Sequence, residues 1–341
     1  MRVTVLGGSG FVGRHLVATL AVAGHGPIRV LSRSPERVFG DARRSLAVAF
    51  EAVEALSSIG KLSRDDVVAA RDRADRGEAF LRESVEVIEG DARDWGAVRE
   101  AVSGVDAVVH AVGIIRETEG RSYGDTNVGT TQSLIDAMKD VGTSRLIYMG
   151  ILGASDDPEM PYGRSRWQAE SAVTESGLDW TVVKPSLVLG VSDAVSRRTV
   201  KLLRTGPIAL LPFPDGGRTK LQPMYVSDLA AALTLCVTEP ERAGQTYEIG
   251  GPEHIALVDI ARAFAAELGI KRVYSLPMPR FVLQFGAALM GRVLKDPPIT
   301  AAELSQLRED NVTALDSVEQ AFGFAPRRFF DYVSYVRNVV P

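Results

Sequence analysis

Three glycines near the start of the chain have the spacing of a nucleotide phosphate-binding turn. Residues 3–13 read VTVLGGSGFVG, so a short β-branched run leads directly into Gly7, Gly10 and Gly13. Glycines let the main chain approach a pyrophosphate, and the third lets the following helix pack on the strand. A helix over 11–23 would then point its first amide groups at the phosphates. We therefore expect a dinucleotide-binding turn rather than a plain strand–turn–helix.

The end of the second expected strand, 28–32, indicates which dinucleotide is preferred. NAD sites usually place a carboxylate here for the ribose 2′-hydroxyl, whereas an arginine accommodates a 2′-phosphate. The chain has Ser32, Arg33 and Ser34 at this point and no acidic residue. We expect NADP(H) as the favoured cofactor and NAD(H) as the alternative. Arg33 is then either a ligand of the 2′-phosphate or a solvated loop cation.

Strands and helices alternate through the first half of the chain. Further strands are expected at 85–88, 106–110, 145–149 and 180–183, with helical patterns between them. Alternation of this kind is typical of a parallel sheet with helices on both faces. We predict an α/β fold: a Rossmann doubly wound parallel sheet, a smaller C-terminal α/β substrate domain and a helical insertion.

The changes in sequence pattern suggest domain boundaries. Residues 1–186 are expected to form the Rossmann domain, and 187–341 the smaller substrate or partner domain, from which 225–250 returns to the sheet. The charged, alanine-rich stretch 36–84 is predicted as an insertion of two helices. Gly60 would end the first helix, and a capping box at Ser63 would open the second. This insertion either packs on the sheet edge or lies beside the adenosine end of the site.

Composition excludes several classes of function. A formal charge of −4 without a dense basic block argues against a nucleic-acid partner, and the four histidines lack the spacing of metal ligands. A single cysteine, Cys236 in an apolar run, excludes a disulfide framework. Met1 leads directly into the first strand, and no apolar stretch approaches the roughly 20 residues of a membrane span. We expect a cytoplasmic protein without a metal site, peripheral to a membrane at most.

Several longer motifs point to a known family. They are GGSGFVGRHL from Gly7, HAVGIIRE from His110, TNVGTTQSLIDA from Thr126, YGRSRWQAE from Tyr162, TVVKPSLVLG from Thr181, GGRTKLQPMYVSDLA from Gly216 and DNV at Asp310. With them, nearly the whole chain resembles the atypical, extended-type short-chain dehydrogenases/reductases. It is most similar to the branch with the NADPH-binding accessory subunit of respiratory complex I and its bacterial relatives. The glycine motif is generic, whereas the segment at Gly216 and the DNV tail are discriminating.

The resemblance implies roles for individual residues. Those implied to contact the dinucleotide are Gly7, Ser9, Gly10, Phe11, Val12 and Gly13 at the pyrophosphate, Arg33 at the 2′-phosphate, Asp91 and Ala92 at the adenine, Ala111 and Gly113 beside the nicotinamide ribose, and Tyr162, Arg166 and Pro185. The catalytic set that it implies is Tyr162, Arg166 and Asn127.

The resemblance is incomplete at the catalytic residues. Active members pair a tyrosine with a lysine four residues later and a serine about a dozen residues earlier. Here Arg166 stands at the lysine position and Gly150 at the serine position. Arginine supplies positive charge and a forked hydrogen bond, but it does not release a proton. Loss of the serine donor would slow hydride transfer roughly 10²- to 10³-fold.

Three functions remain open at this stage. The first is a slow NADP(H)-dependent reductase of a quinone-like or apolar carbonyl substrate, resembling a complex I-associated subunit. The second is a non-catalytic nucleotide-binding protein with a structural or redox-sensing role. Nucleotide-sugar epimerase or dehydratase activity is the third. An apolar run at 281–294, flanked by Arg280, Arg292 and Lys295, either lies on a membrane or a respiratory partner or docks on the small domain's own core.

Overall fold

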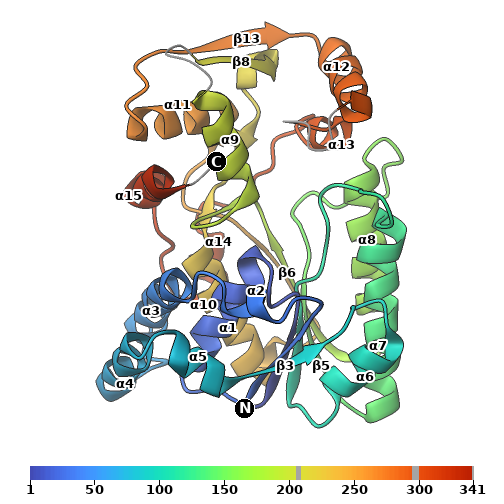
Figure 1. Cartoon of the computed structure of the whole chain (residues 1–341), viewed down its shortest axis with the longest axis vertical. Coiled ribbons are helices and arrows are strands. Elements are labelled where there is room, and N and C mark those ends of the chain that lie inside the picture. Colours follow the sequence, from blue (N-terminus) through green and yellow to red (C-terminus); the bar gives the residue numbers. More distant parts are fainter. Residues whose placement is uncertain (205–208, 294–298, 340–341) are drawn as a thin grey trace.

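The computed structural model describes residues 1–204, 209–293 and 299–339 of the chain. At its centre lies a parallel sheet of seven strands in the order β11-β6-β5-β4-β1-β2-β3 (Figure 1). These strands are β1 (Val3–Leu6), β2 (Ile28–Ser32), β3 (Val85–Glu89), β4 (Ala107–His110), β5 (Arg145–Met149), β6 (Asp179–Pro185) and β11 (Gln245–Ile249). The predicted α/β Rossmann fold is confirmed.

Helices cover both faces of the sheet, as Figure 1 shows. One face carries α6 (Trp95–Val102), α7 (Thr130–Val141) and α8 (Pro161–Thr174). The other carries α1 (Phe11–Val22), α3 (Ala42–Ser58) and α10 (Val226–Thr238). Helix α1 is buried along nearly its whole surface, because the sheet lies on one side of it and α3 on the other. This explains why its sequence is apolar all round.

The insertion forms four helices where two were expected. They are α2 (Glu36–Phe39), α3, α4 (Arg64–Asp75) and α5 (Glu78–Ser84). The predicted capping box is present, since Ser63 Oγ accepts from the Asp66 amide and the Asp66 carboxylate accepts from the Ser63 amide. The insertion does not simply extend the sheet edge. Helix α3 packs against α1 and α10, because Leu46, Ala49 and Val53 line its inner side.

One helix boundary differs from the sequence prediction in a way that affects the site. The sequence from Asn127 to Lys139 predicts a helix that opens at Asn127, whereas in the structure a π-helical turn, η1 (Gly124–Gly129), runs directly into α7. Asn127 therefore lies inside a helical segment instead of at its start. Single π turns inside helices often occur at functional sites.

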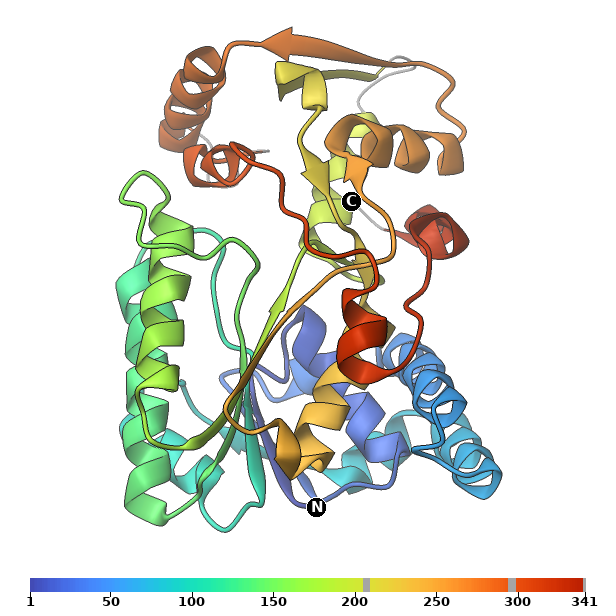
Figure 2. The ribbon, with the colours of Figure 1, turned by 180° about the vertical axis from the view of Figure 1, so that it is seen from behind.

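The remaining segments form a smaller α/β part at the end of the molecule opposite the N-terminus (Figures 1 and 2). Its elements are β7 (Val188–Leu189), α9 (Ala194–Leu203), β8 (Ala209–Pro214), η2 (Asp215–Gly217), β9 (Lys220–Leu221), β10 (Met224–Tyr225), β12 (Ile255–Ala256), α11 (Leu257–Glu267), β13 (Val273–Met278), α12 (Arg280–Val293), α13 (Ala301–Ser305), α15 (Phe329–Tyr332) and η4 (Val333–Asn338). A second apolar core joins most of them, but not α12 and α13, and in it Tyr225 stacks on Tyr332 with ring centroids 4.5 Å apart.

Two later segments join the central sheet. Residues 225–250, which we expected to return to it, supply α10, the short η3 (Pro240–Arg242) and β11, which pairs with β6. Helix α14 (Ser317–Phe322) packs beside β11 through Phe322, whose ring lies 5.0 Å from that of Tyr247. No helix among the residues that the structure describes has the length and apolar character needed to cross a membrane.

Candidate functional site: a dinucleotide crevice

The glycine turn lies where the strand order reverses, between β1 and β4. In open parallel sheets, ligands bind at this switch point, outside the carboxyl ends of the strands. Gly7 has φ +86°, and a Cβ there would lie 2.7 Å from the Ala111 carbonyl oxygen. A Cβ on Gly13 would lie 2.1 Å from the Gly7 carbonyl oxygen. Both positions therefore require glycine, and the backbone forms the close-packed cradle that a pyrophosphate needs.

The amino end of α1 completes this cradle. Gly10 caps the helix without a side chain, and its amide donates to the Gly7 carbonyl at 2.8 Å. The first amides of a helix have no partner inside it, so those of Phe11, Val12 and Gly13 are available to an anion. Arg14, a residue that the sequence analysis did not select, donates to the carbonyls of Ser9 and Gly10 and fixes the turn. Its signal in the sequence is a cation directly after the third glycine. The residues present fit a dinucleotide.

Arg33 and Asp91, which the resemblance implies at the 2′-phosphate and the adenine, lie side by side just after the ends of β2 and β3. The Arg33 guanidinium lies 3.7 Å from the Asp91 carboxylate, and its side chain is 47% exposed. Arg93 also holds this carboxylate through both oxygens, and these hydrogen bonds lower the pKa of Asp91. Ala92 lies between Asp91 and Arg93 in the sequence. The Asp91 carboxylate is thus shared between Arg33 and Arg93.

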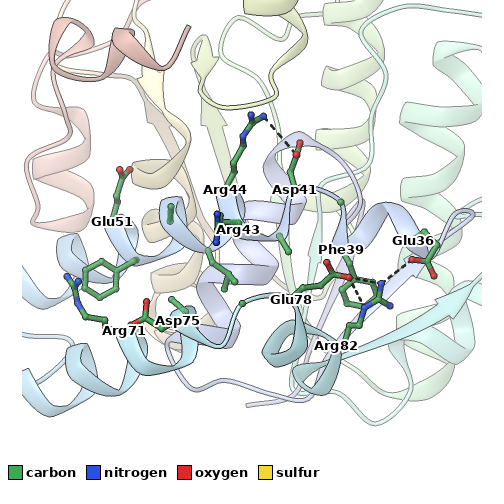
Figure 3. A pocket seen from close by; sticks show the side chains of 17 residues that line it. Glu36, Phe39, Asp41, Arg43, Arg44, Glu51, Arg71, Asp75, Glu78 and Arg82 are labelled. Carbon is green, nitrogen blue, oxygen red and sulfur yellow. Dashed lines mark hydrogen bonds and ion pairs between the residues drawn. The ribbon is translucent and has the colours of Figure 1, made fainter. Parts of the chain in front are cut away.

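The insertion approaches the same end of the crevice. A cavity of about 1150 Å³ opens between the start of α3 and the helices α4 and α5 (Figure 3). Asp41 at its rim lies 3.8 Å from Arg14 and accepts a hydrogen bond from Ser192. Arginines and carboxylates line the cavity in comparable number, so the electrostatic potential inside it is not strongly positive or negative. We interpret it as a space between packed helices, beside the dinucleotide crevice but separate from it.

One face of α8 carries the groups expected to do chemistry. Tyr162 and Arg166 lie one turn apart on this face, and Glu170 follows one turn later. The Tyr162 ring is half-buried, with its centroid 5.8 Å from that of Tyr123. Burial raises the pKa of Tyr162, and the nearby charge of Arg166 opposes this shift only in part. The phenol is therefore protonated at neutral pH, as a proton donor must be.

Arg166 is almost fully buried and is held by main-chain carbonyls. Its guanidinium donates to Val112 at the end of β4 and to Met149 at the end of β5. It also lies under Gly113, where an added Cβ would come within 2.4 Å of Nη1. Its Nε has no hydrogen-bond partner. The positive charge is thus in place beneath Ala111 and Gly113, but two of its donors bind protein rather than a ribose.

The serine position of active relatives is filled by other side chains. A Cβ on Gly150 would lie 3.1 Å from Lys184 Cγ and 3.5 Å from Glu170 Oε2. Lys184 Nζ bridges Glu170 and Glu248, at 3.2 Å from each. Burial raises the pKa of Glu170, an effect that the Lys184 charge opposes. A buried ion pair therefore occupies the region where a serine hydroxyl would otherwise polarise a carbonyl group.

No nearby serine provides an evident substitute for that hydroxyl. Ser155, the candidate closest in sequence, has a buried Oγ without a hydrogen-bond partner in the loop between β5 and α8. Ser165 on α8 is fully engaged, because its Oγ donates to the Tyr162 carbonyl and accepts from Asn127 Nδ2.

Asn127 holds the crevice together. It is completely buried, accepts from the Ile114 amide at 2.9 Å and donates to Ser165. It thereby fixes the loop after β4 against α8. We expected Asn127 in the catalytic set, and its contacts define a positioning residue. Pro185 ends β6 behind the site, where its carbonyl accepts from the Leu152 amide.

The smaller C-terminal part closes over the same crevice through residues that the sequence analysis did not select. Arg116, in the loop after β4, binds both oxygens of Glu303 on α13 at 2.6 and 3.0 Å. Glu303 also accepts from Arg198 on α9 at 3.0 Å. In the DNV tail, Asn311 donates to the Leu152 carbonyl and accepts from Ser186. These bonds place α13 above the α8 face.

His110 contributes no base to this site. It is completely buried at the end of β4, and burial lowers its pKa to about 3. Its Nε2 lies 2.9 Å from the Thr131 hydroxyl. In the described ranges, His, Cys, Asp and Glu side chains form no group of three or more that could hold a metal ion.

Comparisons with known proteins agree with this architecture. A family model described as NAD(P)H-binding matches residues 47–201. Subunit 9 of the complex I alpha subcomplex from Arabidopsis thaliana is 26% identical over 265 residues, covering 76% of this chain and 56% of the relative. The subunit from Rattus norvegicus is 25% identical over 231 residues, covering 67% and 60%. The chain thus spans less than two thirds of the length of these relatives.

A reductase is similar in sequence, and a reductase and an epimerase are similar in fold. A 2-alkyl-3-oxoalkanoate reductase from Stenotrophomonas maltophilia is 26% identical over 273 residues, covering 70% of this chain and 82% of the relative. Among solved structures, an NADPH-dependent quinone oxidoreductase from Escherichia coli, complexed with NADPH, has a TM-score of 0.69 at 17% identity and covers 98% and 99% of the two chains. A nucleoside-diphosphate-sugar epimerase from Staphylococcus aureus has a TM-score of 0.68 at 16% identity, covering 98% and 100%.

The cradle, the sheet order and the matched family model are those of an NAD(P)H-binding Rossmann protein similar to the short-chain dehydrogenases/reductases. Within that class, the sequence relatives support the resemblance that the motifs predict, to the atypical branch with subunit 9 of the NADH dehydrogenase alpha subcomplex.

Proposed function

We propose that the chain binds NADP(H) and uses it to reduce a quinone-like or apolar carbonyl substrate slowly. The observation that carries this proposal is the contrast within one crevice. The glycine cradle at Gly7 and Gly13 is complete, and a protonated Tyr162 is in place, whereas Gly150 provides no hydroxyl to polarise a carbonyl. Such a site transfers hydride without one of its usual sources of transition-state stabilisation.

The preference for NADP(H) over NAD(H) is part of this proposal. Arg33 at the end of β2, where an NAD site would have a carboxylate, supports it. The apolar character of the substrate is supported by two neighbours: the E. coli quinone oxidoreductase in fold, and the oxoalkanoate reductase in sequence.

The test compares binding with turnover in the full chain. We expect NADPH to raise the melting temperature and to be oxidised slowly when a short-chain quinone is added. Tyr162→Phe should keep the thermal shift and lose turnover by about 10²-fold or more. The control is Tyr274→Phe, because Tyr274 is an exposed tyrosine on β13. If NADPH does not change the melting temperature of the chain, the proposal is refuted.

A second candidate is a nucleotide-binding protein that senses redox poise without turnover. The observation that favours it is Arg166, whose guanidinium binds the carbonyls of Val112 and Met149. The same experiment separates the two, since a thermal shift without any NADPH oxidation would support this candidate. Epimerase or dehydratase activity is the weakest of the three, because it requires the serine and lysine that Gly150 and Arg166 replace.

Association with a respiratory complex is proposed from the subunit 9 relatives alone. Since the chain spans only part of their length, co-migration of the tagged chain with complex I in a native gel is the direct test.

A further inference from the structure

The most unusual surface of the molecule lies on α12, far from the glycine cradle. Phe281, Phe285 and Leu289 follow one another at intervals of four residues, so they form a stripe along one side of the helix. Their exposed fractions are 72, 74 and 53%. Ala287, on another side, is only 2% exposed. The helix therefore buries a small residue and exposes large ones, the reverse of what folding alone favours.

Two more exposed apolar side chains lie on β13, the strand that precedes α12 in the chain. Tyr274 and Leu276 of β13, two residues apart and hence on the same side of the strand, are 50 and 43% exposed. Figures 1 and 2 show β13 and α12 together at the end of the long axis opposite the N-terminus. We call these five side chains the apical face. Elsewhere in the described ranges, exposed large apolar side chains occur singly, as Val68 and Phe330 do.

The charged residues within the segment that carries the apical face are all basic. Between Glu267 and Asp296 the sequence holds five of them: Lys271, Arg272, Arg280, Arg292 and Lys295. Lys271 and Arg272 are exposed just before β13 begins. Arg280, at the start of α12, is paired with Asp215 at 2.9 Å, so its charge is partly compensated. Lys295 lies outside the described residues.

We propose that the apical face docks on an anionic phospholipid surface. A helix with exposed aromatic and aliphatic side chains, bracketed by cations and free of acids, lies flat in the headgroup region, where the apolar side chains leave water and the cations meet lipid phosphates. In contact with water alone, two phenylalanines exposed on one stripe would not stabilise the protein, and such a patch is typical of an interaction site. Two copies that met through this face would bring their basic residues together, so the absence of acidic residues between Glu267 and Asp296 favours the membrane over a second copy of the chain.

Docking through the apical face would bring the membrane close to the crevice. Helix α12 packs against α13, whose Glu303 binds Arg116 above the α8 face. A membrane at the apical face would thus lie next to the element that closes the crevice. The inference goes beyond the proposed reductase and holds whether or not Tyr162 transfers a proton.

Flotation of the full chain with vesicles tests the proposal. We expect the wild type to float with vesicles of mixed phosphatidylcholine and phosphatidylglycerol at low salt, and much less with phosphatidylcholine alone. The double variant Phe281→Ser/Phe285→Ser should lower the partition coefficient about tenfold or more. Lys271→Gln/Arg272→Gln should lower it by about fivefold for each charge removed.

The matched control is Val68→Ser/Phe330→Ser, which removes two exposed apolar side chains from other surfaces and should float like the wild type. Thermal melting and NADPH binding verify that every variant folds. The proposal is overturned if the wild type stays in the dense fraction with anionic vesicles, or if it floats equally with neutral ones. It is also overturned if Phe281→Ser/Phe285→Ser converts a dimer to a monomer in sedimentation without any flotation, since the face would then join two copies.

Discussion

The two ends of the dinucleotide crevice are built in different ways. At the cofactor end, contacts between main-chain atoms dominate, because Gly7 packs on Ala111 and Gly13 packs on Gly7. At the reactive end, around Tyr162, the groups that matter are side chains. There Arg166 binds backbone carbonyls, and Lys184 fills the space beside Gly150.

This difference shows that the packing of the fold maintains the glycine cradle but not the side chains of the reactive end. The glycine cradle is also the contact between β1 and α1, so any side chain there disturbs packing as well as binding. The reactive end has no such constraint. Gly150 lies beside the Lys184–Glu170 ion pair, and the fold is maintained although this position has no hydroxyl group.

The largest effect should come from the cofactor end. In Gly13→Ala the new methyl group overlaps the Gly7 carbonyl oxygen at 2.1 Å, so α1 must move away from β1. We expect NADPH affinity to fall about 100-fold or more, together with a loss of stability of about 1 to 3 kcal/mol. Calorimetric titration and thermal melting measure the two effects. Gly286→Ala is the matched control, since nothing lies within 4 Å of the added methyl. Unchanged NADPH binding by Gly13→Ala would contradict the cradle.

A smaller effect is expected at the adenosine end. In the proposed NADP(H) site, Arg33→Gln removes a charged hydrogen-bond donor to the 2′-phosphate, so we expect NADPH affinity to fall by about 1.5 to 3 kcal/mol, or about 10- to 100-fold. NADH affinity should change by less than about threefold, because NADH has no phosphate there. Competitive titration of both cofactors measures the ratio, with Arg99→Gln, an exposed arginine paired with Asp140, as the control. An equal loss for both cofactors would mean that Arg33 only supports the fold.

The smallest effect should be the pH dependence at the reactive end. Burial raises the pKa of Tyr162 above its ordinary value of about 10, so the phenol stays protonated throughout the neutral range. His110, with a pKa of about 3, stays neutral over the same range. We therefore expect kcat/KM for quinone reduction to vary by less than about twofold between about pH 6 and pH 9. A titration with a midpoint near neutrality would identify another proton donor.

Much of the fold follows from local patterns that the sequence displays openly. The β2 and β5 boundaries match the predicted ranges 28–32 and 145–149, because β-branched and apolar runs between turn residues specify buried strands. The capping box at Ser63 depends only on residues three positions apart. The number of helices in the insertion was predicted less well. The short α2 and α5 carry too few residues for a periodic signal, and tertiary packing holds them in place.

For the candidate site, the sequence by itself determined which residues lie at the ends of the strands and which share a face of α8. Glycine spacing, strand ends and helical periodicity are local properties, so the sequence alone was enough to select Gly13, Arg33 and Tyr162 as candidates. Only the tertiary structure decided what these groups touch. That Arg166 binds two carbonyls, that Lys184 fills the space beside Gly150 and that α12 exposes its phenylalanines depend on contacts between distant segments. No local pattern encodes such contacts, because burial is a property of the whole fold.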